Sequence, residues 1–271
     1  MKKYFKIQIE ITSTEKGEIL IAQLSDILFY AFEQENNLLN AYINEINFDE
    51  EKLKEILPAN TAFLKTIIEE ENWNKQWEHS IGPVIVHDFA AIRPSFHKPV
   101  KGVKYELIIT PKMSFGTGHH ATTYLMIELM ETMNFIGKNV IDFGTGTGVL
   151  SILAEKCGAS KIIAIDFDDW SIRNATENIE ANHCQNILLK QQENLSEIKP
   201  ADILLANINL NILNLESSAI AGLLKPGSLL LVSGFLIPDE QKMQHIFEEK
   251  DLVKKQTKQR GDWLAIVFEK R

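Results

Sequence analysis

A glycine-rich turn near the middle of the chain is the segment best suited to bind a ligand. It follows an apolar, strand-like stretch, Asn139–Phe143, and places glycines at Gly144, Gly146 and Gly148. A turn of this kind between a strand and a helix lets a ligand approach the backbone closely, because glycine carries no Cβ. We therefore predict that these three glycines form a cofactor-binding loop.

The spacing of these residues indicates which cofactor the loop binds. When the dinucleotide-binding pattern G-x-G-x-x-G/A is read from Gly144, its last position falls on Val149, so the pattern fails. The sequence instead reads D-x-G-x-G-x-G from Asp142, which resembles the first motif of Rossmann-like methyltransferases that use S-adenosylmethionine (SAM). A carboxylate suits SAM, which is cationic and has no pyrophosphate. Asp142 is predicted to bind SAM, directly or by orienting the loop; the alternative is that it only ties down loop amides.

Acidic residues follow the next predicted strand. Asp166 ends the strand Lys161–Asp166, 22 residues after Gly144. In doubly wound folds an acid at this place accepts hydrogen bonds from ribose hydroxyls, so we predict that Asp166 binds the cofactor. Asp168 and Asp169 come directly after it and fit the N-cap and first turn of the next helix.

A side-chain amide ends a further predicted strand, Asp202–Asn207. The carboxyl ends of parallel strands meet at one edge of the sheet, where ligands bind. The amide oxygen of Asn207 could accept a hydrogen bond from an amine nucleophile, so we predict that Asn207 is the catalytic residue and orients the amine or the cofactor. Many amino-group methyltransferases carry Asn-Pro-Pro-Tyr here; this chain has Asn-Ile-Asn, so that match is partial.

The elements that must position these residues alternate between strands and helices. Beyond the three strands already named, strands are predicted at 187–190 and 228–233, with helices at 149–157, 171–182, 211–224 and 238–249. Such alternation predicts an α/β fold with a parallel, doubly wound sheet. The last two strands, 252–259 and 263–269, are so close in sequence that they must form an antiparallel hairpin. We therefore expect a Rossmann-like domain whose mostly parallel sheet ends in that hairpin.

The front of the chain has a different pattern. Strands predicted at 3–11, 29–35, 38–44 and 61–68 and helices near 14–28 and 49–57 follow in the order βαββαβ. This order predicts a small α+β ferredoxin-like domain at residues 1–68, a linker at 69–80 and the Rossmann-like domain at 81–271. Within the linker, Trp73 and Trp77 share one helix face. They are interpreted as packing onto a neighbouring domain, with lining of a substrate site as the alternative.

Negative charge is concentrated in this front part. Residues 1–80 hold 8 of the 28 Lys and Arg and 15 of the 37 Asp and Glu, a net of −7, which leaves 20 and 22, a net of −2, for the rest. An acidic domain is a poor match for a phosphate backbone, so no direct nucleic-acid binding is expected. It suits a basic protein partner, or it simply keeps a small domain soluble. With two cysteines and no long apolar run, the chain is predicted to be cytoplasmic, without a membrane segment.

A second polar loop lies upstream of the glycine turn, and it carries a family resemblance. It reads Phe115-Gly116-Thr117-Gly118-His119-His120-Ala121-Thr122-Thr123. This segment resembles the Phe-Gly-Thr-Gly-Thr-His-Pro-Thr-Thr signature of the ribosomal protein L-eleven methyltransferases. The resemblance also includes the Trp73/Trp77 region, Asp142–Gly148, Asp166, Ala206-Asn207-Ile208, Ser233-Gly234 and Gly261-Asp262-Trp263. His119, Ala121 and Thr145 depart from the family's Thr, Pro and Cys.

The adjacent histidines of this loop also raise the question of a metal site. His119 and His120 could serve metal binding or acid–base chemistry, but no second cluster of ligand-type residues accompanies them in the sequence. We therefore predict no metal.

The family resemblance implies both an activity and a substrate. It implies an enzyme that transfers methyl groups from SAM to the α-amino group and lysine side chains of ribosomal protein L-eleven of the large subunit. Thr123, Gly144, Asp166 and Asn207 match the family's cofactor-binding positions. It further implies a monomer whose front domain recognises the substrate across a flexible linker.

Three alternatives remain. The first is a SAM-dependent methyltransferase of nucleic acid, of another protein or of a small-molecule amine. The second is a non-catalytic ribosome-assembly or binding protein. The third is a nicotinamide-dependent oxidoreductase, which Val149 disfavours.

Overall fold

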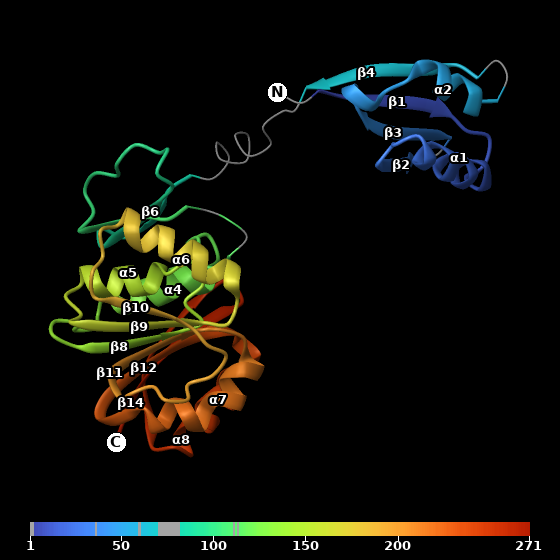
Figure 1. Ribbon diagram of the computed structural model, residues 1–271. Helices are drawn as coiled ribbons and strands as arrows, with labels where there is room; N and C mark the ends of the chain where they lie inside the picture. The colour runs from blue at the N-terminus through green and yellow to red at the C-terminus, as the bar shows by residue number, and fades with distance from the viewer. Residues whose placement is uncertain (1–2, 36, 59–60, 70–81, 111, 113) are drawn as a thin grey trace. The chain divides into compact units, whose positions relative to one another are not determined.

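The computed structural model describes residues 3–35, 37–58, 61–69, 82–110, 112 and 114–271. The chain divides into two compact units, Met1–Ile81 and Gly82–Arg271 (Figure 1). The predicted linker, apart from Glu69, lies outside the described residues, and so do Trp73 and Trp77. None of the helices in the described ranges is long and apolar enough to cross a membrane.

The first unit is a four-stranded sheet with two helices. Its elements are β1 (Lys3–Glu10), α1 (Thr14–Asp26), β2 (Ala31–Glu35), β3 (Leu38–Asn44), a short 3-10 turn η1 (Glu45–Asn47), α2 (Glu50–Ile56) and β4 (Phe63–Glu69). The strand order is β2-β3-β1-β4, and the three pairings are antiparallel, as in a ferredoxin-like fold. Ser13 and Asp49 cap the two helices through their side-chain oxygens. The predicted βαββαβ order is confirmed.

The second unit is built on a seven-stranded sheet of order β10-β9-β8-β11-β12-β14-β13. The strands are β8 (Asn139–Phe143), β9 (Lys161–Asp166), β10 (Ile187–Gln191), β11 (Ala201–Asn207), β12 (Leu224–Leu236), β13 (Leu252–Arg260) and β14 (Trp263–Lys270). The sheet is parallel from β10 to β12, whereas β14 and β13 run antiparallel at its edge. The α/β fold with a C-terminal hairpin is therefore confirmed.

Helices cover both faces of this sheet. Figure 1 shows α4 (Ala121–Met130), α5 (Val149–Lys156) and α6 (Asp169–Ala181) on one face, and α7 (Leu210–Gly222) and α8 (Glu240–Glu248), preceded by the turn η2 (Ile237–Asp239), on the other. Along β11, Ile203 and Leu205 enter one core, while Leu204 and Ala206 enter the other. A strand buried on both faces is held firmly, and its carboxyl end is therefore a rigid place for a site.

A small sheet precedes the large one. It consists of β5 (Val84–Val86), β6 (Ala90–Arg93) and β7 (Tyr105–Ile108), in the order β5-β6-β7. These strands are missing from the sequence-based prediction, because segments of three or four residues are too short to show a periodic pattern.

Candidate active site

A cavity of about 580 Å³ opens where β8, β9 and β11 end. This volume lies within the usual range of small-molecule sites. Four of the predicted site residues line it, namely Gly144, Gly146, Asp166 and Asn207. The other three, Thr123, Asp142 and Gly148, are buried behind its wall.

The glycine loop is held by hydrogen bonds within the protein. Each of the five backbone N–H groups from Gly144 to Gly148 donates to a protein oxygen: two to Ile165 O, one to Asp166 Oδ2, one to Phe115 O and one to Thr145 O, at 2.8–2.9 Å. In loops that bind pyrophosphate, such N–H groups point at the phosphates instead. None of these five remains for a phosphate, which argues against a dinucleotide and favours a cofactor without pyrophosphate.

Glycine is required in this loop for two reasons. Gly144, Gly146 and Gly148 have φ values of +76°, +54° and +82°, a region that other L-residues rarely adopt. A Cβ on Gly144 would lie 2.3 Å from the side chain of Ile208, and one on Gly146 would lie 2.3 Å from the backbone oxygen of Phe115. The loop therefore packs directly against the two segments that complete the cavity.

Asp142 is buried and stabilises the glycine loop through hydrogen bonds. Its Oδ2 accepts hydrogen bonds from the Thr145 hydroxyl (2.7 Å), the Ser151 hydroxyl (2.6 Å) and the Ser151 backbone N–H (3.2 Å). Complete burial raises the pKa of Asp142 above its ordinary value, and the hydrogen bonds from Ser151 and Thr145 oppose that rise. These contacts agree with orientation of the loop and equally with the alternative that Asp142 only ties the loop down, and binding of SAM by Asp142 stays a prediction.

Asp166 faces the cavity and also holds backbone. Its Oδ2 accepts from Gly146 N at 2.9 Å, and its Oδ1 accepts from Asp168 N at 3.1 Å. A carboxylate has about four acceptor positions, so it can also accept from hydroxyl groups of a ligand. Asp168 is the N-cap of α6 and accepts from Ser171 N, which agrees with the sequence-based interpretation.

Asn207 presents an amide whose oxygen is unused. Its Nδ2 donates to Thr123 Oγ1 at 3.4 Å, while its Oδ1, in the described part of the chain, is buried and has no hydrogen-bond partner. A buried acceptor without a partner is costly, and a ligand N–H would satisfy it once the amide turns its oxygen toward the cavity. Thr123 therefore contacts the site through Asn207.

Three aromatic rings line the same cavity as Asn207. The His120 ring lies between those of Phe115 and Trp263, with centroid distances of 5.1 and 4.7 Å, and all three line the cavity. His120 also caps α4, because its Nδ1 accepts from Thr122 N. His119 lies elsewhere, with its Nε2 3.0 Å from Gly82 O. Across the described residues, no group of three or more His, Cys, Asp or Glu could hold a metal ion.

Comparison with known proteins agrees with this geometry. The family model described as ribosomal protein L11 methyltransferase (PrmA) matches residues 4–271. The chain belongs to this family. A ribosomal protein L11 methyltransferase from Porphyromonas gingivalis is 38% identical over 268 residues, covering 96% of this chain and 92% of its own. Its counterpart from Phocaeicola vulgatus is 36% identical over 262 residues, covering 93% of each chain.

A solved structure supports the same assignment. A ribosomal protein L11 methylase from Lactobacillus delbrueckii subsp. bulgaricus aligns with a TM-score of 0.65 at 26% identity, covering 70% of this chain and 100% of that one. The protein is thus a SAM-dependent methyltransferase, and SAM is its cofactor. The residues present fit SAM: the loop N–H groups are occupied, the carboxylate of Asp166 faces the cavity, and the oxygen of Asn207 lacks a partner among the described residues.

Sequence reasoning missed part of the L11 methyltransferase site. Phe115 and Trp263 were noted only as parts of the family resemblance, and His120 there and as a possible metal or acid–base residue, although all three line the cavity. They are 5 and 143 residues apart along the chain, so no local spacing places them together. The contact of a segment before β8 with the start of β14 follows only from the sheet order.

Proposed function

We propose that this chain transfers methyl groups from SAM to amino groups of ribosomal protein L11, namely the α-amine and lysine side chains. The observation that carries the proposal is that Asn207 lines the cavity while its amide oxygen is buried and, within the described residues, has no partner. An amine offers the N–H that this oxygen lacks.

The acceptor amine must be neutral to act as a nucleophile. An α-amino group with a pKa of about 7.7–8.0 is neutral in roughly a tenth of molecules at pH 7, whereas a lysine near 10.4 is neutral in fewer than about one in a thousand. When bound, SAM supplies an activated methyl group with a positively charged sulfur. Burial and a nearby positive charge both lower the pKa of an amine, so a dedicated base is not required.

The residues of the cavity have distinct roles in this proposal. Gly144, Gly146 and Asp166 hold SAM, with the Asp166 carboxylate accepting from the ribose hydroxyls. Asn207 Oδ1 accepts a hydrogen bond from the amine and so aims its lone pair at the methyl group; such positioning supplies much of the catalysis. The rings of His120 and Trp263 exclude water, and aromatic faces attract the positive charge that develops on nitrogen.

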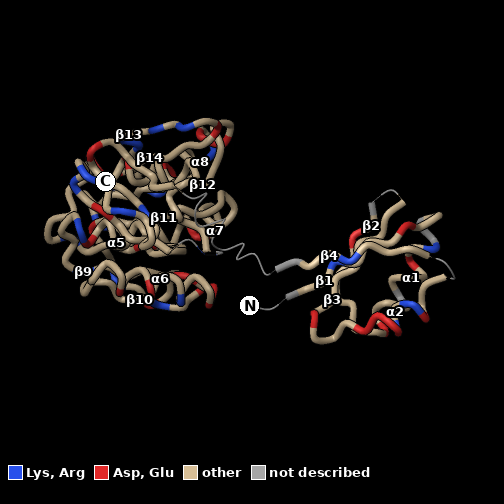
Figure 2. Tube along the Cα trace, turned by 90° about the horizontal axis from the view of Figure 1, so that it is seen from above, with Lys and Arg blue, Asp and Glu red and all other residues tan. Residues whose placement is uncertain are grey.

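The first unit is proposed to recognise the substrate, with residues 1–68 as the recognition domain, 69–80 as the linker and 81–271 as the catalytic domain. Figure 2 shows acidic residues gathered on and before α2; these are Glu45, Asp49, Glu50, Glu51 and Glu55, of which Asp49 and Glu50 form ion pairs with Lys52 and Lys54 of the same helix. An acidic surface attracts a lysine-rich protein. The KM for such a protein should therefore rise with salt concentration, whereas the Kd for SAM should not.

The direct test is a methyl-transfer assay with labelled SAM. Purified large-subunit ribosomal proteins serve as acceptors, and mass spectrometry locates the label. We expect label on the α-amine and lysines of ribosomal protein L11. Tight SAM binding with label only on a different protein would contradict the proposed substrate but leave the methyltransferase assignment in place.

A further inference from the structure

Three buried asparagines lie one helical turn apart on α6 and its C-cap, and the methyl-transfer chemistry proposed above uses none of them. Asn174, Asn178 and Asn182 are 1%, 0% and 9% exposed. Residues spaced by four lie on the same face of a helix. We call these residues the asparagine ladder.

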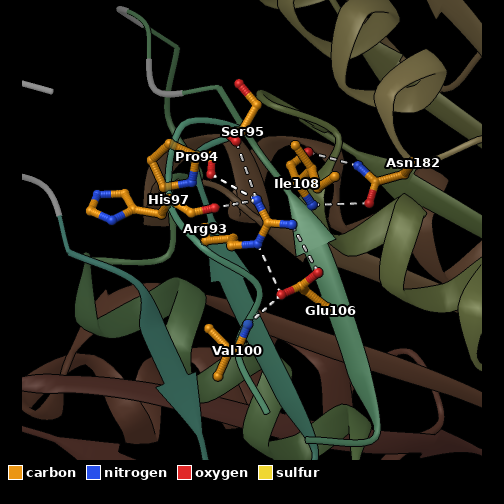
Figure 3. Close-up of polar contacts among 8 residues, drawn as sticks. All are labelled: Arg93, Pro94, Ser95, His97, Val100, Glu106, Ile108 and Asn182. Carbon is orange, nitrogen blue, oxygen red and sulfur yellow. Dashed lines mark hydrogen bonds and ion pairs between the residues drawn. The ribbon is translucent and has the colours of Figure 1, made fainter.

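The ladder pairs with the backbone at the end of β7. Asn182 accepts from Ile108 N at 3.0 Å and donates to Ile108 O at 2.7 Å, as the dashed lines of Figure 3 show. Asn178 Oδ1 accepts from Thr110 N at 2.9 Å, and Asn174 Nδ2 lies 3.4 Å from Thr110 O. Four helix residues advance about 6 Å and two strand residues about 6.7 Å, so one turn matches alternate strand residues. Asn182 and Asn178 therefore take hydrogen-bonding positions that a neighbouring strand would fill at the end of β7 and just beyond it, while Asn174 shares Thr110 with Asn178.

Asn178, one residue of the asparagine ladder, also contacts the glycine loop. The Nδ2 of Asn178 donates to Thr147 O at 2.8 Å. Thr147 is fully buried and joins the glycine loop to the upstream loop, because its N–H donates to Phe115 O (2.9 Å) and its hydroxyl donates to Gly116 O (2.7 Å). Asn178 thus bonds the glycine loop with one atom and, with the other, Thr110, which lies five residues before the upstream loop in the sequence.

We propose that Asn178 is a positioning residue for SAM binding, acting through Thr110 and Thr147. The glycine loop and the upstream loop are in close contact at Gly146, where an added Cβ would lie 2.3 Å from Phe115 O. Gly146 and Phe115 both line the cavity, so a small shift of either loop changes the wall that SAM contacts. Asn182 belongs to the same ladder and also bonds backbone, but its partners are Ile108 and its own helix. It therefore serves as the matched control.

The test compares Asn178→Leu with Asn182→Leu in the full-length chain. Both variants lose buried hydrogen bonds of a side-chain amide, so both should lower Tm. Only Asn178→Leu should raise the SAM Kd, measured by calorimetry without an acceptor, by about 10–100-fold, the range that loss of a buried hydrogen bond gives. Asn182→Leu should leave the Kd within about threefold of wild type. In turnover, Asn178→Leu should raise KM for SAM while kcat at saturating SAM stays within about threefold.

A second variant keeps the proposal testable if Asn178→Leu does not fold. Asn178→Asp retains the acceptor for Thr110 N but loses the donor to Thr147 O, so hydrogen exchange should quicken at Thr147 N–H and not at Thr110 N–H, with a raised SAM Kd. Equal Kd values for the Asn178 and Asn182 variants, or an unchanged Kd in folded Asn178→Asp, would overturn the proposal. Because Kd is measured without an acceptor, the outcome does not depend on which amine is methylated.

Discussion

The two sides of the cavity satisfy their polar groups in opposite ways. On the glycine-loop side (residues 144–148 and Asp166), the five loop N–H groups donate to protein oxygens, and Asp166 accepts two backbone N–H groups. On the Asn207 side (Asn207, His120 and Trp263), the amide oxygen is buried and, in the described part of the chain, unpaired, and two aromatic rings line the same cavity. On the first side the loop N–H groups are paired without a ligand and Asp166 keeps acceptor positions for one, whereas on the second side the amide oxygen has no partner among the described residues.

The glycine-loop side therefore contributes mainly the shape of the cavity, whereas the Asn207 side contributes a polar group that can bond the reacting amine. A loop whose donors are all occupied contributes a fixed surface, and a ligand contacts it mainly by fitting. A buried acceptor without a partner costs about 1–3 kcal/mol, which a ligand N–H recovers on binding. Changes on the glycine-loop side should therefore alter SAM affinity, and changes on the Asn207 side should alter turnover.

The largest effect is expected from Gly146→Ala. The new Cβ would lie 2.3 Å from Phe115 O, which is backbone and cannot move aside cheaply, so we expect the SAM Kd to rise by more than about 100-fold. Gly137→Ala is the matched control, because Gly137 also has a positive φ (+69°) but has nothing within 4 Å of its Cβ position. Calorimetry with SAM and thermal melting separate the two. Equal loss of affinity in both variants would mean that backbone strain, and not the fit of the loops, is responsible.

A smaller effect, on turnover, is expected from Asn207→Ala. Loss of the amide oxygen should lower kcat by about 10–100-fold, because the amine loses the hydrogen bond that positions it. The control is Asn209→Ala: Asn209 also lines the cavity, but its oxygen caps α7 through Ile212 N at 3.1 Å, so its loss should lower Tm and spare kcat.

Steady-state turnover and SAM calorimetry on Asn207→Ala decide between its two possible roles. Reduced kcat with unchanged SAM Kd assigns the oxygen to the amine, and a raised Kd assigns it to the cofactor. If neither quantity changes, Asn207 has no role in the reaction.

Features built from neighbouring residues could be predicted from the sequence, whereas features built from residues far apart in the chain could not. The residues from Asp142 to Gly148 are contiguous, and their φ requirements and spacing leave a local pattern, so the loop and the α/β fold were predicted. Asn178 contacts Thr110 and Thr147, residues 68 and 31 positions away, and an asparagine inside a helix has no distinctive pattern. The small sheet β5-β6-β7 was missed because strands of three or four residues are too short to show a periodic pattern, and the asparagines that bond at the end of β7 leave no local pattern either.

The hydrogen-bond network of Arg93 and Glu106 belongs to neither side of the cavity. Changes in it should therefore alter the stability of the fold and leave SAM binding unchanged. Arg93 donates to both carboxylate oxygens of Glu106 at 2.9 and 3.0 Å and to the backbone oxygens of Pro94, Ser95 and His97 (Figure 3). The hydrogen bond from Arg93 is the main cause that lowers the pKa of Glu106, opposed by burial and assisted by Val100 N. The folded state therefore binds a proton at Glu106 more weakly than the unfolded state.

This network predicts a pH dependence that Glu106→Gln should remove. The stability from the lowered pKa is present above the unfolded pKa of about 4.3 and is lost as the pH falls through the lower folded value. Urea unfolding at pH 6 should show the variant less stable by roughly 1–2 kcal/mol, with the difference shrinking below about pH 4. The SAM Kd at pH 7 should stay within about twofold. A constant stability difference across this pH range would show that the charge of Glu106 contributes nothing.

The smallest effect is expected from Trp263→Phe, which trims one aromatic ring of the cavity without removing it. Trp263 starts β14 and places its ring 4.7 Å from that of His120, so phenylalanine keeps an aromatic contact there but leaves part of the cavity wall open to water. Since an aromatic pair contributes about 0.5–1.5 kcal/mol, kcat/KM for the amine acceptor should fall by roughly two- to tenfold, with the SAM Kd unchanged. Competition kinetics with SAM and the acceptor measure both quantities in one enzyme preparation. A rise in the SAM Kd equal to the loss in kcat/KM would place Trp263 with the glycine loop, and the division of the cavity into two sides would then be wrong.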